Sequence, residues 1–109
     1  MVADYNTAHR AAANSFQQAH SDTYILEFDV YTFLSGILDD PSSVGIVNTT
    51  SYCPNYDAPD IATNYANYGC LPINEYFWYN SGHITYYVHE LLAAAVKKYL
   101  IRESMTIGV

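Results

Sequence analysis

The stretch with the clearest chemical potential is Asn80-Ser81-Gly82-His83, which follows an aromatic run and precedes the last helical pattern of the chain. An imidazole is the side chain best suited to exchange protons near neutral pH. A histidine on a loop directly before a helix can project into a rim site while the helix anchors it. This placement predicts a general base at His83. The plainer interpretation, a loop histidine without chemistry, stays open at this point.

Two cysteines, Cys53 and Cys70, bracket a segment rich in Asn, Tyr, Pro and Asp. Secreted proteins often close such irregular excursions with a disulfide, which favours a Cys53–Cys70 bridge over two free thiols. Asn48-Thr49-Thr50 matches the N-glycosylation pattern, so Asn48 is a candidate acceptor, although such tripeptides also arise by chance. The four histidines and two cysteines show no metal-ligand spacing, so we expect no metal and no cofactor.

Aromatic residues crowd the stretch just before His83, from Tyr76 through Trp78 to Tyr79. Trp78 and Tyr79 are candidates for substrate binding, as the wall of an acyl or sugar pocket. Alternating packing in a core explains the same residues equally well.

Charge and hydropathy exclude several classes of function. Four basic residues against 11 acids give a net charge of −7, which would repel nucleic-acid backbones and anionic lipid surfaces. No stretch approaches the ~20 apolar residues of a membrane span, and residues 1–20 lack the apolar centre of a signal peptide. The cysteines and the glycosylation pattern nevertheless favour an extracellular protein. We therefore expect that Met1 is not the natural start and that the full-length parent is secreted.

The expected elements, in chain order, are few. Helical spacing predicts an amphipathic helix over about 4–18 and a last helix over about 86–101 that Thr85 could cap. The β-branched and aromatic run at 23–31 predicts a buried strand, with Asp29 near its end as a weak rim candidate or a plain cap. A short helix should end at Asp39-Asp40-Pro41, and a long irregular loop should fill 41–75. One strand cannot form a parallel sheet alone, so this is the inventory of a fragment whose other strands lie upstream.

Several strings resemble fungal GDSL-type (SGNH hydrolase) lipases and acetylesterases. They are CPNY at 53–56, GCLP at 69–72, YFWYNSGHITYYVHELLA at 76–93, ADYN at 3–6 and DVYTFLSGILDDPSSVG at 29–45. The resemblance covers nearly all of this chain but only about the C-terminal third of the family's domain. It implies an α/β fold, as the C-terminal fragment of a three-layer α/β/α flavodoxin-like sandwich, with residues 1–109 as one partial domain.

The resemblance also implies a Ser-His-Asp triad in which His83 matches the catalytic base. Two residues depart from the family's late Asp-x-x-His-Pro block: Asn80 stands in place of the Asp, and Ile84 in place of the Pro. The Asn80 carbonyl can accept a hydrogen bond from the imidazole and orient it, but it supplies no negative charge. A His83–Asn80 pair is therefore one interpretation, and Asn80 as a simple turn residue is the other.

The nucleophile is missing. None of the eight serines lies in a Gly-Asp-Ser or G-x-S-x-G setting. The prediction is therefore the C-terminal segment of a serine hydrolase acting on carboxylic esters of small molecules or carbohydrates, inactive as an isolated chain. The alternative is a small secreted module that binds carbohydrate through its aromatic surface without catalysis. The oligomeric state stays open.

Overall fold

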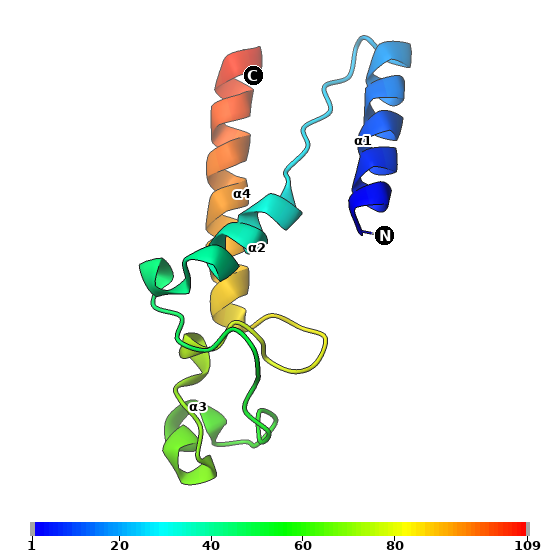
Figure 1. Cartoon of the computed structure of the whole chain (residues 1–109). Helices are drawn as coiled ribbons and strands as arrows, with labels where there is room; N and C mark the ends of the chain where they lie inside the picture. Colours follow the sequence, from blue (N-terminus) through cyan, green and yellow to red (C-terminus); the bar gives the residue numbers. More distant parts are fainter. Residues whose placement is uncertain (1, 109) are drawn as a thin grey trace.

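The computed structural model describes residues 2–108. It has three long helices, α1, α2 and α4, and four short helical turns, which lie between α2 and α4 in the sequence. In chain order the elements are α1 (Val2–Ala19), α2 (Val30–Asp39), η1 (Pro41–Val44), α3 (Ile61–Asn64), η2 (Tyr65–Tyr68), η3 (Ile73–Glu75) and α4 (Tyr86–Ile107). Figure 1 shows α2 crossing α4, the region of α3 lying beyond the start of α4, and α1 standing apart on the far side of an extended connection.

The predicted α/β sandwich fragment is wrong for the described residues, because they form no sheet. Their β-type contacts are two isolated bridges, Asn48 with Tyr76 in parallel and Trp78 with Ile84 in antiparallel orientation. The strand expected at 23–31 is likewise absent. Residues 23–29 run without a ladder partner, and a strand without a neighbour lacks the hydrogen bonds that define it.

Helix α2 begins earlier than expected, and its N-terminal cap explains why. The Asp29 carboxylate accepts hydrogen bonds from Thr32 N at 3.0 Å and from Thr32 Oγ1 at 2.7 Å. These bonds satisfy a free amide of the first turn, so Val30 and Tyr31 join the helix rather than a strand. Asp29 is thus a helix cap, and its expected position at a strand end is corrected.

The other helices follow the sequence closely. Thr85 caps α4 as expected, with its Oγ1 accepting from Val88 N at 3.4 Å. Helix α4 continues beyond the expected end at 101 until Gly108, whose φ of 79° lies in the left-handed region that favours glycine. The last turn of this longer helix holds no basic residue, and Lys97 and Lys98 lie well before its negative end.

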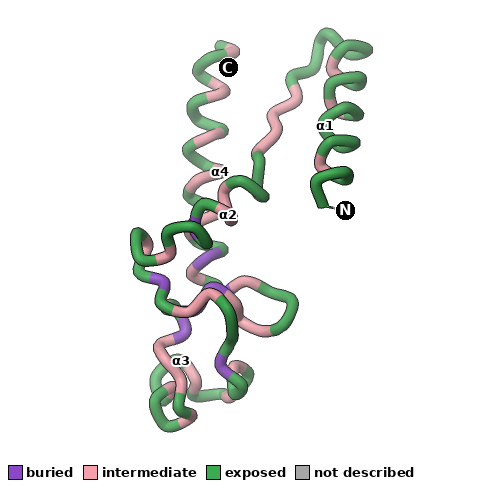
Figure 2. The backbone as a smooth tube through the Cα atoms, in the orientation of Figure 1, coloured by how far each residue is buried: buried purple, intermediate pink, exposed green. Residues whose placement is uncertain are grey.

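The buried hydrophobic side chains form two small clusters, both outside α1. The first joins Ile37, Ile46, Phe77 and Val88, and the second joins Cys53, Ile73 and Tyr76. Tyr76 and Phe77 are adjacent yet belong to different clusters, as expected for an extended stretch whose side chains alternate in direction. Figure 2 shows the buried positions confined to the middle and the turn-rich end of the molecule, whereas α1 is mostly exposed.

Candidate functional site: the His83 loop

A tight loop carries His83 and is closed by its own backbone. Trp78 and Ile84 form the antiparallel bridge at its base, and Tyr79 N donates to His83 O at 2.8 Å. Thr85 N donates to Phe77 O at 3.0 Å, which joins the returning chain to the aromatic segment. The loop is therefore a short hairpin, and His83 lies on its returning side.

Asn80 and His83 meet within this hairpin. His83 Nδ1 lies 2.9 Å from Asn80 Oδ1, and Gly82 N donates to the same oxygen at 3.0 Å. A backbone N–H can donate only to an acceptor, so the Gly82 bond requires the amide oxygen, not the amide nitrogen, to face the loop interior. His83 Nδ1 must then carry the proton and donate it. In a neutral imidazole with that tautomer, the outer nitrogen Nε2 carries the lone pair that accepts a proton.

The helix that follows holds this loop in place through Thr85. Thr85 is fully buried, and its Oγ1 donates to Tyr76 O at 2.9 Å while accepting from Val88 N. One hydroxyl thus ties the aromatic segment to the first turn of α4. His83, two residues earlier, is exposed, so its imidazole lies at the surface beside a buried threonine.

The two aromatic candidates for substrate contact pack inward in this structure. The Trp78 ring meets Phe77 edge-on with centroids 4.9 Å apart. The Tyr79 ring meets Tyr56 in the same manner at 5.0 Å, and its hydroxyl donates to Tyr56 O at 3.0 Å. Both side chains are half-buried, and their role toward a substrate stays a prediction.

The predicted disulfide is present, and the cluster of side chains around it contacts the His83 hairpin. Cys53 and Cys70 are joined with their Cα atoms 5.6 Å apart, and Cys53 is buried. The cluster around this bridge includes Tyr79, the residue at the base of the His83 hairpin. The disulfide-closed segment therefore positions Tyr56, which in turn holds Tyr79.

Hydrogen bonds within the disulfide-closed segment also order it. The Asp60 carboxylate accepts from Tyr68 Oη at 2.6 Å and from Asn64 Nδ2 at 3.0 Å. The bond from Tyr68, then the bond from Asn64, lowers the pKa of Asp60, and the same Asp60 contact raises the pKa of Tyr68. The sequence analysis did not single out this trio. The spacing of Asp60 and Asn64 by four residues at the start of a helix was the available signal.

Asn48, the glycosylation candidate, is half-buried and hydrogen-bonded through its side chain. Its Oδ1 accepts from Thr50 N at 3.0 Å and from Ser51 N at 2.9 Å, and its Nδ2 donates to Ser51 Oγ at 2.9 Å. Its backbone pairs with Glu75 and Phe77. Asn48 thus shapes the turn that leads into the disulfide-closed segment, and its glycosylation stays a prediction.

Within residues 2–108, no hydrogen bond joins His83 to a serine, and no group of three or more His, Cys, Asp or Glu could hold a metal ion. Ser81 is exposed and lies two residues before His83 in the sequence. In the same range no helix is long and apolar enough to cross a bilayer. Gly82 is the residue of this candidate site that the sequence did not suggest, since it is the backbone amide, not a side chain, that bonds Asn80 Oδ1.

The chain is similar to the GDSL esterase/lipase APG of Arabidopsis thaliana, with 28% identity over 97 residues. The match covers 85% of this chain and 28% of the relative, so the chain spans less than a third of that protein's length. This relative comes from a plant, whereas the residue pattern resembled fungal members. No family model matches the chain, and no solved structure matches it. The comparison supports a likeness to GDSL-type hydrolases and leaves the position of the segment within such an enzyme to be proposed.

Proposed function

We propose that this chain is the histidine-bearing part of a GDSL-type serine ester hydrolase, with His83 as the general base and Asn80 as the residue that orients it. The observation that carries the proposal is the 2.9 Å contact between His83 Nδ1 and Asn80 Oδ1 inside a closed hairpin. The likeness to a GDSL esterase/lipase points to the same chemistry.

In the proposed reaction His83 Nε2 takes the proton from a serine hydroxyl as that oxygen attacks the ester carbonyl. The same nitrogen then returns the proton to the departing alcohol. Replacing the triad carboxylate by an amide costs about 10⁴ in turnover in serine proteases, because the wrong tautomer of histidine results. In this hairpin the Gly82 amide turns the oxygen of Asn80 toward the ring, which favours the productive tautomer. Only the missing negative charge then weakens the pair.

The nucleophile belongs to polypeptide outside these 109 residues in this proposal, which places the present segment after the nucleophile block in the complete enzyme. None of the eight serines here has the required sequence setting. The substrate class is a carboxylic ester of a small alcohol or a carbohydrate. The disulfide fits an extracellular site of action, since such bonds persist in oxidising compartments.

The decisive experiment grafts this chain in place of the matching segment of the Arabidopsis relative and follows hydrolysis of a chromogenic acetyl ester. We expect turnover that His83→Ala lowers at least about a thousandfold. His89→Ala is the matched control, because His89 is exposed on α4, and it should leave turnover unchanged. Equal turnover in the two variants would exclude His83 as the base.

Two further measurements test the parts of the proposal separately. The isolated chain should hydrolyse the ester at the background rate, and activity that His83→Ala abolishes would place the nucleophile among these serines instead. Gly82→Pro removes the amide that orients Asn80, whereas Gly82→Ala keeps it and meets no neighbouring atom. In the graft, only the proline variant should lose turnover, and ¹⁵N NMR of His83 should show the Nδ1 proton in the alanine variant.

A further inference from the structure

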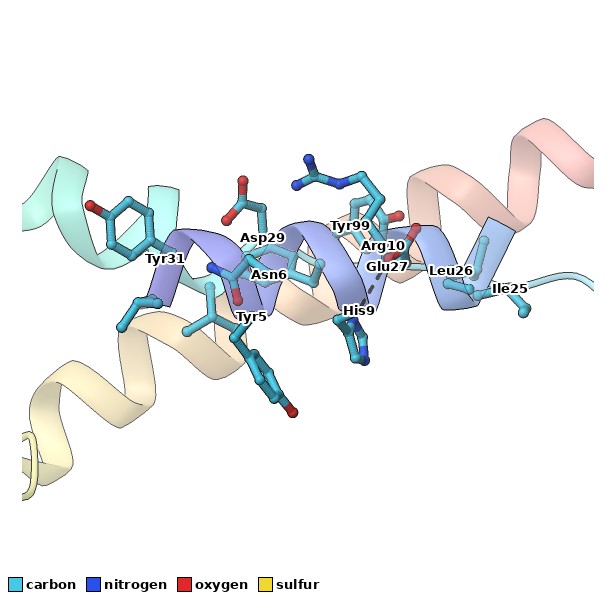
Figure 3. A pocket seen from close by; sticks show the side chains of 14 residues that line it. Tyr5, Asn6, His9, Arg10, Ile25, Leu26, Glu27, Asp29, Tyr31 and Tyr99 are labelled. Carbon is cyan, nitrogen blue, oxygen red and sulfur yellow. Dashed lines mark ion pairs between the residues drawn. The ribbon is translucent and has the colours of Figure 1, made fainter. Parts of the chain in front are cut away.

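The hollow between α1 and the connection to α2 does not include the candidate base. It has a volume of about 910 Å³ and is lined by α1, by that connection, by the start of α2 and by Tyr99. Figure 3 shows this space, with the ion pair between His9 and Glu27 at 3.9 Å. No residue of 41–91 lines it. The orientation of His83 therefore depends on its own hairpin and on the segment that supports this hairpin.

Tyr79 lies directly opposite His83 in the hairpin. The antiparallel bridge joins Trp78 to Ile84, and the next residue on each side is joined by the bond from Tyr79 N to His83 O at 2.8 Å. Directly opposite residues of an antiparallel pair have their side chains on the same face, with Cβ atoms roughly 5 Å apart. Tyr79 is therefore the cross-strand neighbour of the candidate base.

The Tyr79 side chain attaches this loop to another part of the chain. The side-chain hydrogen bonds of Asn80 and His83 stay within the loop. In contrast, Tyr79 Oη donates to Tyr56 O at 3.0 Å, across a sequence separation of 23, and the two rings meet edge-on with centroids 5.0 Å apart. The Asn80–His83 pair thus orients the imidazole within the loop, whereas Tyr79 fixes the loop relative to the disulfide-closed segment.

The disulfide holds the acceptor of this bond in place. Tyr56 follows Cys53 by three residues, and Tyr56 N donates to Cys53 O at 3.1 Å. On the other side of the bridge, Leu71 N, next to Cys70, donates to Tyr76 Oη at 3.1 Å. The aromatic segment is therefore bonded to the disulfide-closed segment at two points, one near each cysteine. Opening the bridge would let these two points separate, and the hydroxyl of the hairpin would lose its fixed acceptor.

We propose that Tyr79 is a positioning residue whose hydroxyl couples the orientation of His83 to the Cys53–Cys70 disulfide. The inference rests on the proposed hydrolase function. The bridge fixes Tyr56 O, the Tyr79 hydroxyl bonds to that carbonyl, and His83 is held where its Nε2 can reach a serine. A chain with two free thiols keeps the imidazole but not its placement. The base is therefore fully effective only in an oxidising compartment, where the bridge persists.

Contact of Tyr79 with the substrate is the competing role, and the two roles predict different kinetics. The Tyr79 side chain is half-buried, and its hydroxyl proton is already donated to Tyr56 O. Misplacing a catalytic group by about 1 Å can cost about 10² in rate, and one lost hydrogen bond accounts for up to about a tenfold change. Positioning therefore predicts a lower kcat with the same KM, whereas substrate contact predicts a higher KM.

The first test compares Tyr79→Phe with Tyr52→Phe in the graft of this chain into the Arabidopsis relative. Both changes keep the ring and remove one hydroxyl, but only the first breaks the bond to Tyr56 O; the Tyr52 ring meets Tyr56 edge-on at 5.9 Å. Tyr79→Phe should lower kcat about tenfold at unchanged KM, and Tyr52→Phe should alter neither. An unchanged kcat for Tyr79→Phe, in a graft that His83→Ala inactivates, would overturn the positioning role and leave the hydrolase assignment intact. A raised KM with kcat retained would assign Tyr79 to the substrate and overturn it equally.

Replacing Cys53 and Cys70 together by serine tests the coupling to the bridge. In that background Tyr79→Phe should lower kcat by less than about twofold, because the acceptor of the hydroxyl is no longer held in place. The same tenfold loss with and without the bridge would mean that Tyr79 acts independently of the disulfide, and the coupling would be wrong.

Hydrogen exchange in the oxidised 109-residue chain gives a readout that needs no turnover. The amide of residue 79 donates to His83 O, so its exchange reports how firmly the hairpin is held. Exchange at this amide should be about tenfold faster in Tyr79→Phe than in the wild type or Tyr52→Phe, with equal helical circular dichroism. Equal exchange in all three chains would overturn the proposal. If His83→Ala leaves the turnover of the graft unchanged, the hydrolase assignment fails, and with it the role of Tyr79 in catalysis, whatever the exchange shows.

Discussion

Residues 2–29 and residues 41–91 of this chain are built in opposite ways. The first region is a long helix and an extended connection with no buried side chain, so its order rests on local helix propensity, on Gln17 and on the contact of Phe28 with Tyr99. The second has no long regular element before α4, yet it holds nearly all the buried residues. Its hydrogen bonds join distant positions, such as Tyr87 Oη to Val44 O at 2.5 Å.

The difference shows that a segment of irregular backbone can be held in place by more tertiary contacts than a long helix. The His83 hairpin lies in the second region, between a buried threonine at the start of α4 and a tyrosine held by the disulfide-closed segment. A base must keep its orientation to act, and long-range contacts supply that constraint where propensity does not. The first region has few such contacts, among them the ring of Phe28 on the rings of Phe33 and Tyr99.

The largest effect should come from Phe77→Ala. This change removes the centre of the first buried cluster and should destabilise the region of residues 41–91. Phe77 is 1% exposed, and truncating a buried phenylalanine costs about 3–5 kcal/mol. Denaturant unfolding followed by near-UV circular dichroism measures the loss. Phe16→Ala is the control, since Phe16 is 47% exposed on α1, and it should change stability by no more than about 0.5 kcal/mol. Equal losses in the two variants would contradict the two-region description.

The next effect concerns the disulfide. Replacing Cys53 and Cys70 together by serine opens a loop with a sequence separation of 17, which should cost about 3 kcal/mol on the chain-entropy account. Because this bridge supports Tyr56 and Tyr79, the Tyr79 amide in the His83 hairpin should also exchange faster with solvent. Exchange in α1 should not change. Unaltered exchange at Tyr79 would show that the hairpin does not depend on the bridge.

The sequence predicted the helices of this chain more successfully than its expected strand. Helix positions were predictable because their signals are local: Thr85 caps α4, and Asp39-Asp40-Pro41 ends α2. The strand at 23–31 was mispredicted because a strand depends on a neighbour that propensity cannot supply, while Asp29 offered the local alternative of a helix cap.

The candidate site divides in the same way. His83 and Asn80 were identified from a family pattern, and the disulfide from cysteine spacing within an irregular segment. Their arrangement was not predictable, because it depends on backbone groups whose position the fold decides. The Gly82 amide determines which atom of the Asn80 side chain faces the His83 ring, and Tyr76 O accepts a hydrogen bond from the Thr85 hydroxyl. No residue-type pattern encodes either contact.

A smaller loss of stability should come from removing the Thr85 hydroxyl, which tests whether this group anchors the hairpin to α4. Thr85→Val keeps the shape of the side chain but leaves the buried Tyr76 carbonyl and the first turn of α4 without their partner. We expect a loss of about 2 kcal/mol. Thr85→Ser retains the hydroxyl and loses one methyl group, which should cost about 1 kcal/mol. Thermal unfolding compares the two, and a serine variant as unstable as the valine variant would argue against the hydroxyl's role.

The smallest effect is a pH dependence that each region should show separately. Hydrogen bonds from the Thr32 backbone amide and then its hydroxyl lower the pKa of Asp29 below 3.8, and bonds from Tyr68 and then Asn64 lower that of Asp60. A depressed pKa in the folded state stabilises it fully above the ordinary value of 3.8, and this contribution is lost as the pH falls through the folded pKa.

Carboxyl NMR titration should therefore give midpoints below 3.8 for both groups. Tyr68→Phe removes the shortest bond to Asp60, so the Asp60 midpoint should rise toward 3.8 while that of Asp29 stays in place. The raised pKa of Tyr68 has the opposite sign: its contribution is present below 10.0 and is lost as the pH rises through the folded value. Wild-type and Tyr68→Phe chains should accordingly converge in stability at both ends of the pH range. A Tyr68→Phe change that moved both aspartates together would mean that the two regions are coupled, contrary to their separate construction.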